Sequence, residues 1–110
     1  MAATTLRGLA ASPGTYVGRV RVIRSIDAAD FEHIEVLVVK TAGVEWLEAI
    51  LRAGAVVTEV GGRTSHAASI CRELGKPCVT AVTGVMATLT DGTTVCVDGG
   101  AGEVVILRTP

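Results

Sequence analysis

The stretch "GGRTSHAASICRELGKPCV", residues 61–79, combines a glycine turn with a helical pattern. Either Thr64 or Ser65 suits the N-cap of a helix, because a hydroxyl oxygen there can accept a hydrogen bond from a free backbone N–H group. Gly75, followed by Pro77, is a typical helix end. We therefore predict a helix that begins at this N-cap and ends at Gly75. Its apolar side is expected to consist of Ala67, Ile70, Cys71 and Leu74.

Two strands and a second helix are predicted before this stretch. The run "AVVTEV", residues 55–60, is typical of a strand and leads directly into the glycine turn. The run "VLVV", residues 36–39, is short and wholly apolar, which is typical of a strand buried on both faces. Between them, "VEWLEAILRAG" predicts an amphipathic helix that stops at Gly54. The core side of this helix is expected to carry Trp46, Leu47, Ile50 and Leu51.

The two ends of the chain have the patterns of loops and strands. The segment "GLAASPG", residues 8–14, has the composition of a loop. The segment "VGRVRVI", residues 17–23, predicts a half-buried strand, with Val17, Val20, Val22 and Ile23 facing or flanking the core. After the helix, "CVTAV", "TTVCVDGG" and "EVVIL" predict strands that close the sheet, with reversals at Asp91-Gly92 and Asp98-Gly99. The fold class is therefore α+β, and residues 1–110 are expected to form a single domain.

Composition limits the partners and the compartment. Lys and Arg number 10 against 11 Asp and Glu, so neither nucleic acid nor an anionic membrane is an expected partner. The sequence has no apolar run of about 20 residues and no secretory leader pattern. Cys71, Cys78 and Cys96 form no C-x-x-C pair and are expected to be small buried thiols. We expect a cytoplasmic protein on these grounds.

The position of His66 in the sequence makes it the candidate nucleophile. It lies in the first turn of the predicted helix, directly after the glycine turn. A neutral imidazole nitrogen is a good nucleophile near pH 7, and a helix N-terminus favours the anion that phosphorylation would create. The hydroxyl groups of Thr64 and Ser65 could add hydrogen bonds to phosphate oxygen atoms. The same residues also have an ordinary explanation, as a surface histidine beside a helix cap.

Other residues near His66 are assigned with alternatives. Gly61 and Gly62 would let the backbone approach a phosphoryl group closely, although a glycine pair is also an ordinary turn. Arg72 either contacts a phosphate on an adjacent domain, or faces solvent or pairs with the neighbours of Glu73. His33 has no glycine turn or cap beside it and is expected to be exposed.

The stretch that begins at Gly61 resembles the phosphohistidine signature of the PEP-utilising enzymes, the family that includes pyruvate phosphate dikinase, PEP synthase and rifampicin phosphotransferase. The matching residues are Gly61, Gly62, Thr64, Ser65, His66, Ala67, Ala68, Arg72, Glu73, Leu74, Gly75 and Pro77. The segments "GLAASPGTYVGRVRVI" and "DGTTVCVDGGAGEVVIL" are also similar to the opening and closing strands of that domain. The chain departs from the pattern at Ser69 and Cys71, and "TAGVEW" lacks a proline often found there.

The resemblance implies a compact, swivelling β/β/α domain that carries phosphoryl groups. His66 would be phosphorylated by an ATP-grasp partner, or by PEP, and would pass the group to an acceptor on a second partner, such as a pyruvate-binding barrel. The chain would bind no cofactor or metal itself, and Mg²⁺ with ATP or PEP would belong to the partner. We expect the phosphocarrier subunit or domain of a split phosphotransferase of dikinase type, which is not active alone.

Two other functions remain open at this stage. The first is a non-catalytic interaction module that keeps the swivelling fold but has lost transfer; the intact Thr-Ser-His triplet ending at His66 argues against it. The second is a metal-binding regulator that uses His66 with cysteines. Cys71 lies five positions further along the helix, and no recognised zinc spacing is present.

Overall fold

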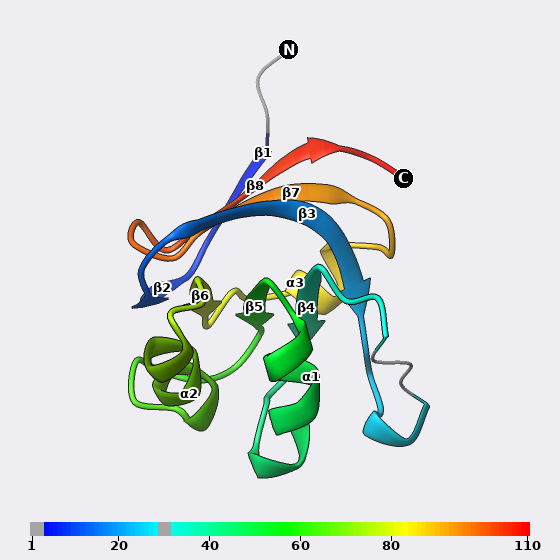
Figure 1. Cartoon of the computed structure of the whole chain (residues 1–110). Coiled ribbons are helices and arrows are strands. Elements are labelled where there is room, and N and C mark those ends of the chain that lie inside the picture. The colour runs from blue at the N-terminus through cyan, green and yellow to red at the C-terminus, as the bar shows by residue number, and fades with distance from the viewer. Residues whose placement is uncertain (1–3, 29–31) are drawn as a thin grey trace.

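The strands and helices form three layers (Figure 1) in a computed structural model that describes residues 4–28 and 32–110. The upper β-layer contains β1 (Thr4–Arg7), β3 (Thr15–Val22), β7 (Thr94–Asp98) and β8 (Glu103–Arg108). The middle β-layer contains β2 (Leu9–Ser12), β4 (Val36–Val39), β5 (Ala55–Thr58) and β6 (Cys78–Thr80). The short helix α1 (Leu47–Arg52) and the longer α2 (His66–Leu74) cover its outer face. The predicted α+β class and β/β/α layering are confirmed.

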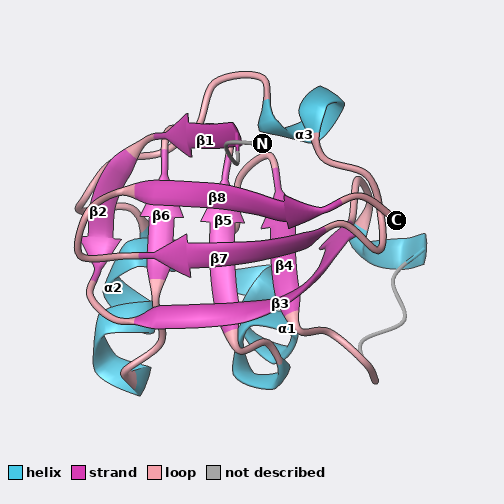
Figure 2. Ribbon diagram, turned by 90° about the horizontal axis from the view of Figure 1, so that it is seen from above, coloured by secondary structure: helices cyan, strands magenta, loops and turns pink. Residues whose placement is uncertain are grey.

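A single long strand connects the two β-layers. The first part of β3 pairs antiparallel with β7, from Thr15 opposite Asp98 to Arg19 opposite Thr94. Its last residues then pair in parallel with β4, beginning with Val20 opposite Val36. The described strands therefore form one mixed sheet in the order β1-β8-β7-β3-β4-β5-β6-β2, which folds over itself. Figure 2 shows the upper strands running across β4, β5 and β6 below them.

The middle layer separates two apolar clusters. Side chains of Val38 and Val57 pack between the β-layers, whereas those of Val39 and Val56 pack under the helices. Successive side chains of a strand point to opposite faces. Since each face of β4 and β5 meets one of the two clusters, consecutive residues of these strands must be apolar. All four residues of "VLVV" are fully buried, which confirms the prediction for that strand.

The amino-terminal segment differs from the prediction of a loop over residues 8–14. Leu9–Ser12 forms β2, which pairs antiparallel with β6 and places Leu9 opposite Thr80. The local composition of this segment favours a turn, but pairing with β6 makes it a strand. Tertiary pairing therefore outweighs local propensity here. The sequence also did not predict β1 or the short α3 (Val85–Thr88), nor the 3-10 turns η1 (Ile26–Ala28) and η2 (Val44–Trp46).

Several predicted core residues are exposed instead. Leu47, Leu51 and Leu74 are 40%, 50% and 41% exposed, and Val17 is 59% exposed. In α1 the buried positions are Ala49 and Ile50, which continue a regular helical spacing from the buried Trp46, so an alanine rather than the two leucines faces the core. Strand β5 ends at Thr58, two residues earlier than predicted.

Gly54 has a packing role rather than the predicted role of a helix cap. The residue after α1 is Ala53, whose backbone is extended. A Cβ atom on Gly54 would lie 2.2 Å from the ring of Tyr16, which occupies the space that a side chain would need.

Candidate functional site

His66 is the first residue of α2, and the predicted ends of this helix are confirmed. Ser65 is the N-cap: its backbone is extended, and its Oγ accepts a hydrogen bond of 3.3 Å from the backbone N–H of Ala68. Gly75 is the C-cap, with a left-handed φ of 70°. Ala67, Ala68 and Cys71 bury one side of α2, and the helix therefore holds His66 at a fixed place above the middle layer.

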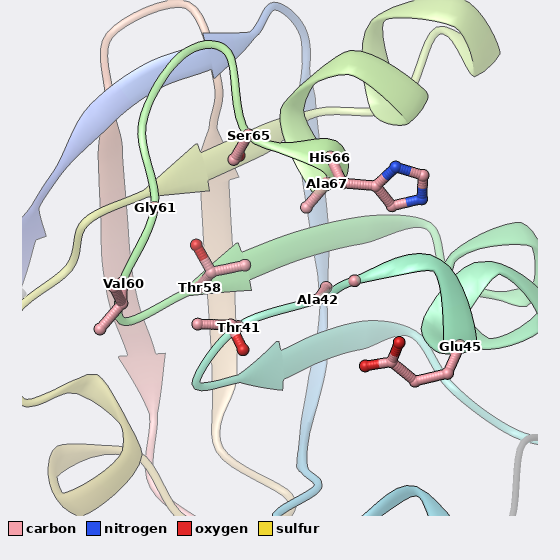
Figure 3. A pocket seen from close by; sticks show the side chains of 10 residues that line it. Thr41, Ala42, Glu45, Thr58, Val60, Gly61, Ser65, His66 and Ala67 are labelled. Atoms are coloured by element: carbon pink, nitrogen blue, oxygen red, sulfur yellow. The ribbon is translucent and has the colours of Figure 1, made fainter.

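A cavity of about 270 Å³ lies beside His66. Its walls come from the N-terminus of α2 and from the segments that follow the carboxyl ends of β4 and β5. Figure 3 shows the imidazole ring and Glu45 on one side of the cavity and Thr58 and Thr41 on the other. The lining residues are Thr41, Ala42, Gly43, Glu45, Thr58, Val60, Gly61, Ser65, His66 and Ala67.

The imidazole ring of His66 is not held by a hydrogen bond at Nε2. This nitrogen is buried, and no partner for it exists among the described residues. A histidine that serves only the core normally has its buried nitrogen hydrogen-bonded. The buried nitrogen of His66 departs from that pattern within the described residues. His33, the other histidine, is exposed as predicted.

The two glycines of the turn differ in their roles. Gly61 has a φ of +137°, a conformation that side chains rarely adopt, and it lines the cavity. Gly62 does not line it, and a Cβ added there would meet no atom of a described residue within 4 Å. The geometry therefore requires glycine at position 61, and the predicted close approach at Gly62 has no counterpart in this conformation.

Two of the predicted phosphate contacts lie away from the cavity. Thr64 is exposed and does not line it. The guanidinium of Arg72 donates hydrogen bonds to the carbonyl oxygen atoms of Ala11, at 2.8 Å, and Arg63, at 2.6 Å. Arg72 therefore braces the turn before His66 against β2, and neither residue is positioned to contact a group in this cavity.

Four residues of the cavity wall were not predicted from the sequence: Thr41, Glu45, Thr58 and Val60. A signal for Thr58 was present, because it is the single polar residue of β5 and stands at the carboxyl end of a buried parallel strand. Ligands bind at that edge in parallel sheets. No comparable local signal marks Thr41, Glu45 or Val60.

Two of the three cysteines are buried thiols, as the sequence predicts, and the third is not. Cys71 and Cys78 are fully buried, and Cys96 is half-buried. A hydrogen bond between the first two thiols lowers the pKa of Cys71 and raises that of Cys78, and burial raises the latter further. Across residues 4–28 and 32–110, no three side chains of His, Cys, Asp or Glu are grouped so that they could hold a metal ion.

Comparison with solved structures identifies the class of fold. The chain is similar to an NMR structure of Enzyme I, with a TM-score of 0.61 and 28% identity over 71% of this chain and 34% of that one. It also superposes on aconitase X from Thermococcus kodakaraensis, with a TM-score of 0.70 over 96% of this chain and 99% of that one, at 22% identity. The second likeness shows the fold alone.

The family follows from the sequence comparisons. Residues 31–102 match the family described as PEP-utilising enzyme, mobile domain, and the chain belongs to that family. It is 44% identical over 102 residues to the phosphoenolpyruvate synthase of Pyrococcus furiosus, a match that covers 90% of this chain and 12% of that protein. The chain thus spans about an eighth (12%) of the length of the curated relatives it matches. None of the helices in the described ranges has the length and apolarity needed to span a bilayer.

Proposed function

We propose that this domain is a phosphoryl carrier in which His66 is the group that is phosphorylated. The observation that supports this most directly is the position of His66 at the first residue of α2, beside a cavity and with a ring nitrogen that no described residue hydrogen-bonds. Membership of the mobile-domain family agrees with such a role.

The site supplies what a transient phosphohistidine needs. Phosphorylation forms a bond between an imidazole nitrogen and phosphorus, while the bond from phosphorus to the donor's leaving group breaks. The imidazole proton passes to solvent. The product is an anion, and the free N–H groups at the start of α2 stabilise negative charge there. Because Nε2 is buried in this conformation, transfer to that nitrogen requires the ring to turn toward the opening.

The donor and the acceptor belong to partners. We propose an ATP-grasp protein or domain as the donor, with PEP as the alternative, and a barrel that binds PEP or pyruvate as one acceptor. Mg²⁺ and the nucleotide would be bound by the donor. The phosphoenolpyruvate synthase relatives are about eight times longer than this chain, which agrees with a mobile part that works between other parts.

The test uses both histidines of the chain. Wild type, His66→Ala and His33→Ala are incubated with lysate of the source cells plus ATP or, separately, PEP, and intact masses are recorded without acid. We expect one phosphoryl group on wild type and on His33→Ala, lost after mild acid treatment, and none on His66→Ala. His33→Ala is the matched control, because it removes an exposed histidine outside the site.

Two results would reject the proposal. Labelling of His66→Ala at the wild-type level would place the phosphoryl group elsewhere. No label on wild type with either donor, in a lysate shown to contain the candidate partners, would favour the non-catalytic interaction module.

A further inference from the structure

Thr58 has a buried hydroxyl group that nothing in the described structure satisfies. It is the last residue of β5, is 1% exposed, and lines the cavity beside His66. Its Oγ1 has no hydrogen-bond partner among the described residues. A hydroxyl group that is removed from water without a replacement partner destabilises a fold. A buried, unpaired threonine at this position therefore needs an explanation other than stability.

Side-chain packing does not explain why position 58 is a threonine. Alternate side chains of β5 face opposite ways, so Thr58 shares the helix-covered face with Val56. The rest of β5 is apolar, and valine has nearly the shape of threonine. A valine at position 58 would fill the same volume without leaving a buried polar atom.

The hydroxyl group faces the turn that leads to His66. A Cβ atom on Gly61 would lie 3.5 Å from Oγ1 of Thr58 and 3.5 Å from Oγ of Ser65. The missing side chain of Gly61 therefore leaves a space between two hydroxyl groups. Figure 3 shows the Thr58 oxygen directed toward this turn, at the inner wall of the cavity.

The position in the sheet favours ligand binding at this wall. Strands β3, β4, β5 and β6 pair in parallel, so their carboxyl ends meet at one edge, where parallel sheets bind ligands. The N-terminus of α2 lies at the same edge. The carboxylate of Glu45 lies on the other side of the cavity, the side of the His66 ring, so the Thr58 wall carries no negative side chain among the lining residues.

We propose that the hydroxyl of Thr58 donates a hydrogen bond to an oxygen of the phosphoryl group carried by His66. This inference rests on the proposed function. This phosphoryl oxygen would occupy the space beside Gly61. The hydroxyl of Ser65 can donate a second hydrogen bond to it, because the Ser65 oxygen accepts from Ala68 and its hydrogen remains available as a donor. Thr58 is then a binding residue of the phosphorylated state, and its hydroxyl is left unpaired only in the unphosphorylated state.

The test measures the phosphoryl exchange between phosphoimidazole and His66. The nitrogen–phosphorus bond of phosphoimidazole breaks, the same kind of bond forms at His66, and imidazole is released, so no partner protein is needed. The equilibrium constant is obtained by intact mass, approached from both directions, for wild type, Thr58→Val and Thr58→Ser. Thermal unfolding of each unphosphorylated protein is measured in parallel.

We expect Thr58→Val to lower the exchange constant about tenfold, as expected for the loss of one hydrogen bond to a charged group. Its thermal stability should stay equal or rise, because a buried unpaired hydroxyl has been removed. Thr58→Ser keeps the donor and should stay within about threefold of wild type. A purely structural role would instead lower stability in Thr58→Val and leave the exchange constant unchanged.

Three outcomes would overturn the inference. An exchange constant for Thr58→Val equal to that of a labelled wild type would show that the hydroxyl is not used. An equal loss in Thr58→Ser would attribute the effect to shape. Wild type that takes no label at His66, either from phosphoimidazole or from ATP and PEP in the lysate, would reject the proposed function and this inference with it.

Discussion

The guanidinium of Arg72 donates a hydrogen bond of 2.8 Å to the carbonyl oxygen of Ala11, which connects α2 in the helical layer to β2 in the middle layer. The same nitrogen reaches the carbonyl oxygen of Arg63 at 2.6 Å, in the turn that precedes His66. One side chain therefore holds together a strand, a helix and the turn that positions the candidate nucleophile.

Replacement of Arg72 by alanine should lower the free energy of unfolding by about 1 kcal/mol, because two backbone carbonyl groups lose a charged donor at a partly exposed site. The midpoint of urea unfolding measures this. Arg52→Ala is the control: Arg52 makes a surface ion pair of 3.4 Å with Glu48, and its loss should cost less than about 0.5 kcal/mol. Equal effects of the two changes would show that the Arg72 contacts add nothing special.

Ser65→Ala should destabilise the protein by about 1 kcal/mol, because the N–H of Ala68 loses its side-chain acceptor at the start of α2. Thr64→Ala, at the exposed position before it, should be close to neutral. Hydrogen exchange at the Ala68 amide provides the local readout. A Thr64→Ala protein that is destabilised as strongly as Ser65→Ala would contradict the assignment of Ser65 as the cap.

The three thiols should differ in their reaction with iodoacetamide. Cys96 is half-buried and should be alkylated in the native protein, whereas Cys71 and Cys78 are fully buried and should react only after unfolding. The raised pKa of Cys78 also keeps that thiol protonated and less reactive. Peptide mapping of native and denatured samples separates the sites. Native alkylation of Cys71 as fast as that of Cys96 would mean that α2 opens readily.

The sequence predicted those parts of the fold that depend on local chemistry. The caps at Ser65 and Gly75 are such parts, since a hydroxyl acceptor and a left-handed glycine act within one turn. Strand β2 could not be predicted in this way, because only its partner β6, far along the chain, makes residues 9–12 a strand. The buried side of α1 was likewise not predicted, because Ala49 faces the core while Leu47 and Leu51 are exposed.

The sequence singled out the histidine of the candidate site, but it did not indicate the residues that complete the cavity wall. His66 stands out through its neighbours in the sequence, whereas Thr41 and Glu45 reach the cavity only because β4 lies beside β5. The assignment of Arg72 to phosphate remains a prediction for other conformations. In this one its donors face Ala11 and Arg63, which could not be known without the position of β2.

Gly99→Ala should destabilise the protein by about 3 kcal/mol, because a Cβ atom at that position would lie 1.7 Å from the carbonyl oxygen of Ser12 and 3.0 Å from the backbone nitrogen of Cys78. These neighbours are backbone atoms, which cannot move aside as a flexible side chain can. Gly62→Ala is the matched control, since its Cβ would lie more than 4 Å from every neighbouring atom that the structure describes, and it should be neutral or slightly stabilising.

The reversal between β7 and β8, predicted at Asp98-Gly99, therefore needs glycine at position 99 for close packing against β2, in addition to the turn chemistry seen in the sequence. The turn passes directly over β2, and the backbone N–H of Gly99 donates a hydrogen bond of 2.8 Å to the carbonyl oxygen of Gly14. Any side chain at position 99 pushes the upper layer away from the strand edge that it covers. If thermal unfolding gave Gly99→Ala the same midpoint as Gly62→Ala, the two layers would not be in contact at this turn.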